Sequence, residues 1–164
     1  MSTIRRLSAA CAALVVVTSA SLVLATPAQA MEGCHGNESD SVSNSKTIAL
    51  PGKPDVNLVV NLCLYDETGF YQGVSIVNWG SSVGGTAFGN RFNYFYSVVW
   101  VQKNDVNKCS NTAYPDINGS DGGSLLHSCS WDAANTSGVS VDGKIVYDVA
   151  NDGKGAYTWQ LTGT

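Results

Sequence analysis

The chain has 164 residues, of which 44% are hydrophobic, and a formal net charge of −4 at pH 7. An excess of acidic residues argues against a nucleic acid or an anionic membrane as its partner, because both are negatively charged. The length suits a single domain with a modest core.

Residues 1–30 have the features of a secretory signal peptide. They contain a basic pair, Arg5 and Arg6, then an apolar run over residues 9–24, and they end on an Ala-Gln-Ala cleavage site. The apolar run is too short for a permanent membrane span. We therefore expect a secreted, extracellular protein that begins near Met31 and carries seven basic and thirteen acidic residues, a net charge of −6.

Four cysteines follow the signal peptide. An even number of cysteines in a small exported chain predicts two disulfides. Four cysteines allow three pairings, and the sequence alone does not choose among them. We expect Cys109–Cys129, which would close a polar loop of about 20 residues, and Cys34–Cys63, which would tie the N-terminal arm to the first strand of the domain.

Residues 31–54 form a polar arm rich in small residues. Within it, residues 46–50 predict one short strand, which Pro51 and Gly52 end. Such a stretch can add itself to the edge of a sheet in its own domain, the simpler interpretation, or in a partner. In the partner case, the side chains of Ile48 and Leu50 would supply specificity. The candidate partner-binding residues are Thr47, Ile48, Ala49 and Leu50.

Residues 55–164 predict the folded domain, beginning with three strands. Residues 56–65 carry valine or leucine at every second position, with Asn57 and Asn61 on the opposite face, a pattern typical of a half-buried strand. Residues 70–79 predict the second strand and residues 92–103 a third, which has apolar residues on both faces and is therefore expected at the centre of a sheet. The residues expected on one face of that third strand are Phe92, Tyr94, Tyr96, Val98 and Trp100.

The second half of the domain predicts a loop, a strand and a hairpin. Residues 104–121 are expected mostly as loop, with a short strand near Cys109, and residues 124–131 as a strand. An Asp-Gly turn then separates residues 144–150 from residues 156–161, which is a strong hairpin signal. About seven short strands without helical periodicity predict an all-β, antiparallel β-sandwich of the immunoglobulin-like kind.

The stretch Gly80–Gly84 fits the G-x-S-x-G pattern of a hydrolase nucleophile elbow, with Ser82 as the nucleophile. Such an elbow needs a helix after the serine, which the glycine-rich residues 84–90 do not favour, and the chain has no β-α-β pattern. The histidine of a triad would have to be His127. We therefore expect a loop between strands, no catalytic residue and no enzymatic activity.

No motif in the sequence predicts a metal ion or another cofactor. Residues 116–122 place oxygen-bearing side chains at alternate positions, as a calcium loop does. However, the glycine is one place late for an EF-hand, and the twelfth position is His127 rather than glutamate. The cysteines and histidines also lack the usual spacings of a zinc site.

Four tryptophans lie in or beside the predicted strands. A row of exposed aromatic residues on a β-sandwich would form a platform for carbohydrate. Trp100 and Trp159 are expected in the core. Trp79 and Trp131 lie at strand ends and are therefore the candidates for an exposed ligand contact.

Three segments resemble small secreted β-sandwich proteins of streptomycetes: Val60-Asn61-Leu62-Cys63, Gln102-Lys103-Asn104-Asp105 and residues 141–163. The resemblance covers most of residues 56–163, and its motifs are structural. Some of these proteins resemble the adaptor subunit of umbrella toxin particles, which joins a lectin-like component to a repeat-containing stalk. The role implied by this resemblance is assembly through strands, without any particular binding residue.

The sequence therefore predicts a secreted, non-catalytic adaptor domain that binds another secreted protein by edge-strand pairing. One alternative is a carbohydrate-binding module that uses Trp79 and Trp131. Another is an extracellular protease inhibitor that presents the loop between Cys109 and Cys129.

Overall fold

The computed structural model describes residue 34 and residues 38–82, 89–133 and 136–164. The predicted signal peptide and the glycine-rich residues 83–88 lie outside these ranges. Within them the chain forms strands, and no helix is long and apolar enough to cross a membrane. The strands are β1 (Glu38–Ile48), β2 (Val56–Glu67), β3 (Phe70–Ser81), β4 (Phe92–Lys103), β5 (Val106–Ala113), β6 (Gly122–Asp132), β7 (Val139–Val149) and β8 (Tyr157–Gln160).

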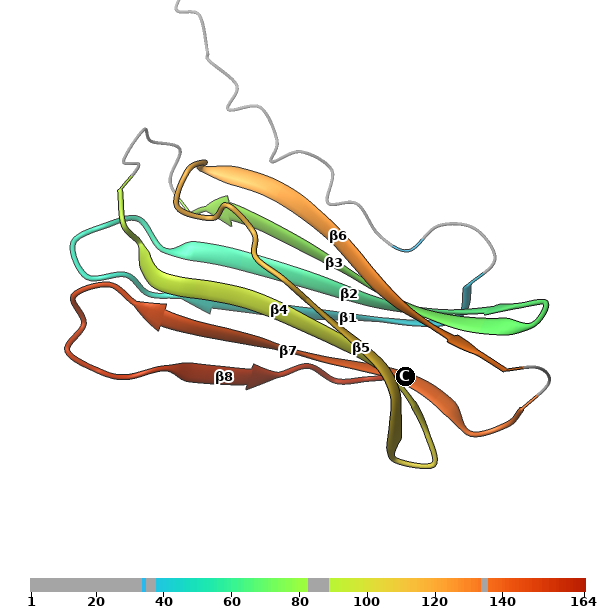
Figure 1. Ribbon diagram of the computed structural model, residues 1–164. Helices are drawn as coiled ribbons and strands as arrows, with labels where there is room; N and C mark the ends of the chain where they lie inside the picture. Colours follow the sequence, from blue (N-terminus) through green and yellow to red (C-terminus); the bar gives the residue numbers. More distant parts are fainter. Residues whose placement is uncertain (1–33, 35–37, 83–88, 134–135) are drawn as a thin grey trace, which may run out of the picture.

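The strands form two antiparallel four-stranded sheets, with the orders β1-β2-β3-β6 and β5-β4-β7-β8. Figure 1 shows the sheets stacked as two layers. The predicted antiparallel sandwich is confirmed, with eight strands in the described residues rather than about seven. Its first three strands lie side by side, unlike the ABED and CFG order of immunoglobulin constant domains.

Strand β1 begins well before the short strand that was expected in the arm. It starts at Glu38 and pairs with β2 almost continuously from there to Ile48. Its sequence, ESDSVSNSKTI, is polar because β1 is an edge strand and most of its side chains are exposed or only half-buried. Hydrophobic periodicity, the signal used to identify strands, is therefore weak here.

The core lies between the inner faces of the two sheets and contains fully buried aliphatic residues from both, among them Leu62 and Val99. Strand β4 is central in its sheet, as predicted. The expectation that Phe92 shares a face with Tyr94 was wrong. The register shifts between these two residues, and this irregularity lets Phe92 join the core at 1% exposure while Tyr94 stays on the outer face at 41%.

Both predicted disulfides are confirmed. Cys34–Cys63 attaches the chain just before β1 to β2, and Cys109–Cys129 joins β5 to β6, each an edge strand of its sheet. Along the same edge, the Asn111 side chain donates to the backbone carbonyl of Ser128 at 2.8 Å. Two disulfides are consistent with an extracellular protein.

Gly73 allows β3 to lie close to the opposite sheet. A Cβ atom added there would lie 2.8 Å from a methyl of Val101 and 2.9 Å from a methyl of Val141, and both valines are fully buried. We expect Gly73→Ala to lower the free energy of unfolding by about 1–3 kcal/mol through overpacking. Urea unfolding measures this. Gly80→Ala on the same strand is the control, because nothing lies within 4 Å of its Cβ position; equal losses in both variants would contradict the packing explanation.

Candidate functional site

A groove of about 490 Å³ lies between the end of β1 and the hairpin formed by β7 and β8. One wall is the chain from Thr47 to Pro51, which leaves β1 and turns towards β2. The other wall comes from β7, the turn of the hairpin and the start of β8. The lining residues are Thr47, Ile48, Ala49, Leu50, Pro51, Tyr147, Val149, Asp152, Lys154 and Tyr157.

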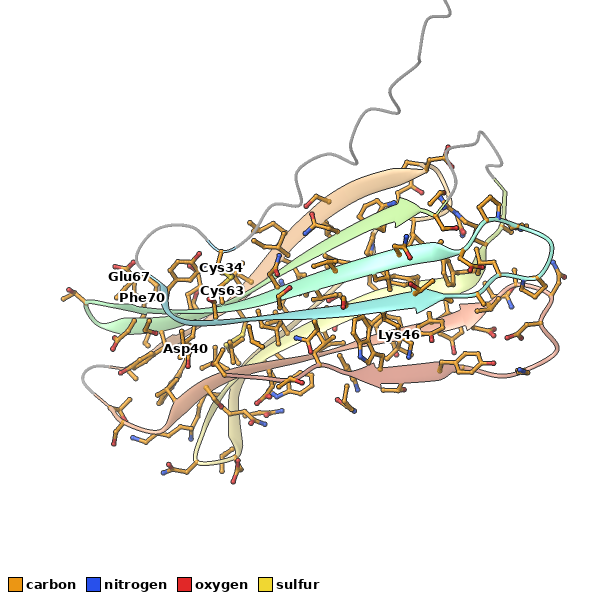
Figure 2. All side chains as sticks on the ribbon, turned by 180° about the vertical axis from the view of Figure 1, so that it is seen from behind. Cys34, Asp40, Lys46, Cys63, Glu67 and Phe70 are labelled. Atoms are coloured by element: carbon orange, nitrogen blue, oxygen red, sulfur yellow. A yellow bond between two sulfur atoms is a disulfide. The ribbon has the colours of Figure 1, made fainter. Side chains whose placement is uncertain are left out.

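The groove is the open end of a seam between two edge strands, β1 and β8. At the other end the Asn44 side chain closes the seam. Its Nδ2 donates to the backbone carbonyl of Thr162 at 3.1 Å, and its Oδ1 accepts from the backbone N–H of Thr162 at 2.7 Å. Lys46 lies between these ends, with Nζ 5.6 Å from the ring centroid of Trp159 and 5.9 Å from that of Tyr147. Figure 2 shows Lys46 in this seam.

The seam opens because β8 is short. Strand β8 pairs only with Lys144–Tyr147 of β7, whereas β1 has eleven residues. Beyond Tyr147, β7 therefore has no β8 neighbour, and the hairpin turn follows. Positive φ angles at Asn151 and Gly153 let the chain reverse there, as the Asp-Gly signal predicted.

The hairpin wall is aromatic and internally bonded. The rings of Tyr147 and Tyr157 stack at 5.3 Å with 18° between their planes. The Tyr157 hydroxyl donates to Oδ2 of Asp152 at 3.1 Å, and the Lys154 backbone N–H donates to Oδ1 at 2.8 Å. Desolvation and the hydrogen bond to Asp152 raise the pKa of Tyr157 above its usual value. The wall thus presents half-buried Tyr157 on a turn that is held in shape, with Tyr147 packed against it at 4% exposure and with Asp152 and Lys154 beside it.

The four predicted partner-binding residues all lie in this wall region, but they divide by exposure. Thr47 and Ala49 are exposed, whereas Ile48 and Leu50 are 4% and 6% exposed and belong to the core. Successive side chains of an extended chain point to opposite sides, so only alternate residues remain accessible. The side chains expected to supply specificity are therefore already packed within the domain.

The structure does not bring Trp79 and Trp131 together. Trp131 lies opposite Tyr71 in the register of β3 and β6, and Trp79 is eight residues farther along β3, a distance of about 26 Å at ~3.3 Å per residue. Trp79 is 7% exposed and donates to Oγ of Ser120 at 3.3 Å. Trp131 is half-buried and stacks on Tyr71 at 6.1 Å. These two residues do not form one platform.

An aromatic cluster that the sequence analysis missed lies on the outer face of the second sheet. It consists of Tyr94 and Tyr96 on β4 and Tyr114 just after β5, and we call it the tyrosine cluster. The centroids of Tyr94 and Tyr96 are 6.1 Å apart, and those of Tyr96 and Tyr114 are 5.8 Å apart. Tyr94 and Tyr96 could be placed on one face from the alternation, but the position of Tyr114 depends on the pairing of β5 with β4.

Ser82 and His127 do not meet. Ser82 is exposed just after β3, and its backbone N–H donates to the carbonyl of Asp55. His127 is 6% exposed, lies opposite Ser75 in the register, and its Nε2 is 2.9 Å from Oγ of Ser97. The Ser75 and Ser97 hydroxyls are 3.4 Å apart, so these three residues form a polar cluster inside the core.

Within the loop between Cys109 and Cys129, residues 116–119 are held on the domain. Ile117 is 2% exposed, and the Asn118 side chain accepts from the backbone N–H groups of Arg91 and Phe92 and donates to the Phe92 carbonyl. Asp116 accepts from Gly119 within its own turn. The oxygens that suggested a calcium loop are thus engaged in structural hydrogen bonds. Among the described residues, no three His, Cys, Asp or Glu side chains lie close enough together to hold a metal ion.

No family model matches the chain, and the comparisons with curated proteins and with solved structures found no match.

Proposed function

We propose that the chain is a secreted, non-catalytic adaptor that binds an extended segment of another secreted protein. The segment would lie along β1, pair with its backbone, and place side chains in the groove beside it. The observation that carries this proposal is the position of the groove, which lies beside an edge strand and is lined by Thr47–Leu50.

The backbone of β1 supplies the affinity in this mechanism. A strand at the edge of a sheet has peptide groups along one side that lack a partner in the sheet, and an added strand can satisfy them. The exposed side chains of β1 are mainly serine and threonine, which leave the edge accessible. The first proline after β1 is Pro51, beyond the end of the strand.

The groove supplies specificity. Its volume is within the range of about 300–1,000 Å³ that is usual for ligand sites. Half-buried Tyr157, which stacks on buried Tyr147, offers an apolar contact, and Lys154 is among the lining residues. A bound segment would therefore place an apolar side chain against Tyr157. The resemblance to adaptor subunits of toxin particles agrees with this kind of assembly and stays a prediction.

Selection of peptides tests the proposal. We expect a phage-displayed library of random linear peptides, panned on the oxidised protein without residues 1–30, to yield extended binders. Ala49→Trp should weaken them at least about tenfold, because the indole would occupy the groove. Hydrogen exchange followed by NMR should show added protection of β1 amides in the complex.

The matched control is Ser130→Trp, which adds the same side chain to an exposed position on β6. This variant should bind like the parent protein. Equal binding to both variants, or protection confined to another strand, would rule out pairing along β1. A deletion of residues 31–52 is unsuitable as a test, because it would remove β1 together with buried Ile48 and Leu50.

A further inference from the structure

We propose that the tyrosine cluster is a second binding site and that its ligand is a neutral glycan. The cluster lies on the outer face of the sheet β5-β4-β7-β8. The proposed peptide groove lies in the seam beside β1, so the two sites use different residues and are independent.

The rings form one continuous surface. Tyr94 contacts Tyr96 along β4, and Tyr96 contacts Tyr114 across to the end of β5. Tyr94 is 41% exposed and Tyr114 is 73% exposed, although both are large hydrophobic residues. An exposed, contiguous group of tyrosines combines apolar rings with hydroxyl groups, which suits an amphipathic ligand.

The size of the cluster favours a small ligand over a folded protein. If a tyrosine contributes about 200 Å², the exposed parts of Tyr94 and Tyr114 together amount to about 230 Å². A stable protein interface buries about 800 Å² on each partner. A few sugar units fit this area better, because the C–H face of a pyranose ring packs on an aromatic ring.

The cross-strand neighbours of the cluster are apolar at its centre, where Val146 lies opposite Tyr96, and polar with balanced charge at its two ends. In the register, Asp148 lies opposite Tyr94, and Lys144 and Thr112 lie on either side of Val98, the next outward residue of β4. Sugar hydroxyls need such donors and acceptors around the rings. One ammonium group and one carboxylate give no net charge, so an uncharged glycan fits better than an acidic one.

The test is calorimetric titration of the oxidised protein with cellohexaose, chitohexaose, xylohexaose and maltohexaose, with polygalacturonate as an acidic probe. We expect at least one neutral oligosaccharide to bind. The double variant Tyr94→Ala, Tyr114→Ala should weaken that binding at least about tenfold, because its stacking surface is lost. Circular dichroism should show that the variant stays folded, since both side chains are exposed.

Leu126→Ala is the matched control, because Leu126 is 59% exposed on the other sheet. It should leave the glycan affinity unchanged. The proposal is overturned if no neutral oligosaccharide binds, if polygalacturonate binds best, or if binding survives the double variant. It is also overturned if the double variant still binds the oligosaccharide but no longer binds the phage-selected peptides. The tyrosine cluster would then be a contact for protein.

Discussion

The free energy of unfolding should fall by about 3 kcal/mol as the pH is lowered from about 6.5 to about 4, through His127 alone. Burial between the sheets lowers the pKa of His127 from 6.5 to about 4, because the charged imidazolium would lose its hydration. The unfolded chain takes up this proton near pH 6.5, whereas the folded chain takes it up only near pH 4. The stabilisation that depends on neutral His127 is therefore fully present above about pH 6.5 and is lost below about pH 4.

Urea unfolding at a series of pH values measures this effect. His127→Gln is the control, because glutamine keeps a hydrogen-bonding group near Ser97 and does not titrate in this range. The difference between the two curves isolates His127 from the carboxylates, including Asp142, whose pKa is raised by burial and by Asp105 and which therefore acts in the opposite direction. Parallel curves for the two proteins would show that burial of His127 carries no such linkage.

Removing the disulfide Cys109–Cys129 should lower the free energy of unfolding by about 3 kcal/mol, the amount expected for a loop of 20 residues. This disulfide also joins the edges of the two sheets, where β5 is largely exposed and pairs only with β4. The double variant Cys109→Ala, Cys129→Ala should therefore lose protection first in β5.

Hydrogen exchange of β5 amides measures the local effect, and urea unfolding the global one. Cys34→Ala with Cys63→Ala is the comparison, because that disulfide closes a loop of similar size but contacts a different part of the sandwich. It should lower the global stability by a similar amount and leave β5 protected. Loss of β5 protection in both double variants would mean that the Cys109–Cys129 disulfide does not hold this edge in particular.

The local signals were strongest where apolar residues recur at every second position of a strand or where a turn needs positive φ angles. Alternating valine and leucine identified β2, and the Asp-Gly turn identified the hairpin of β7 and β8. Strand β1 showed that this signal fails at an edge. Its serines and asparagines form a strand because β2 supplies hydrogen-bond partners, which local periodicity does not report.

The exposed aromatic surfaces could not be predicted from the sequence, because they combine residues that are distant along the chain. The alternation placed Tyr94 and Tyr96 on one face, but Tyr114 joins them only through the pairing of β5 with β4. Trp79 was expected at an exposed strand end, yet the sandwich packs it in the core. A residue at the end of a strand can be exposed or buried, and the loop folded over it decides which.

By itself, the sequence determined the fold class, the presence of two disulfides and a strand-capable segment at residues 46–50, because these follow from alternation, cysteine count and turn residues close along the chain. The tertiary structure decided which of the three possible cysteine pairings forms. Only the tertiary structure decided where β1 begins and which of the residues Thr47–Leu50 stay accessible. It also decided that Tyr147 and Tyr157 lie in the wall of the groove opposite these residues. Such relations arise when two sheets pack, since packing brings together residues about a hundred positions apart whose side chains carry no local sign of one another.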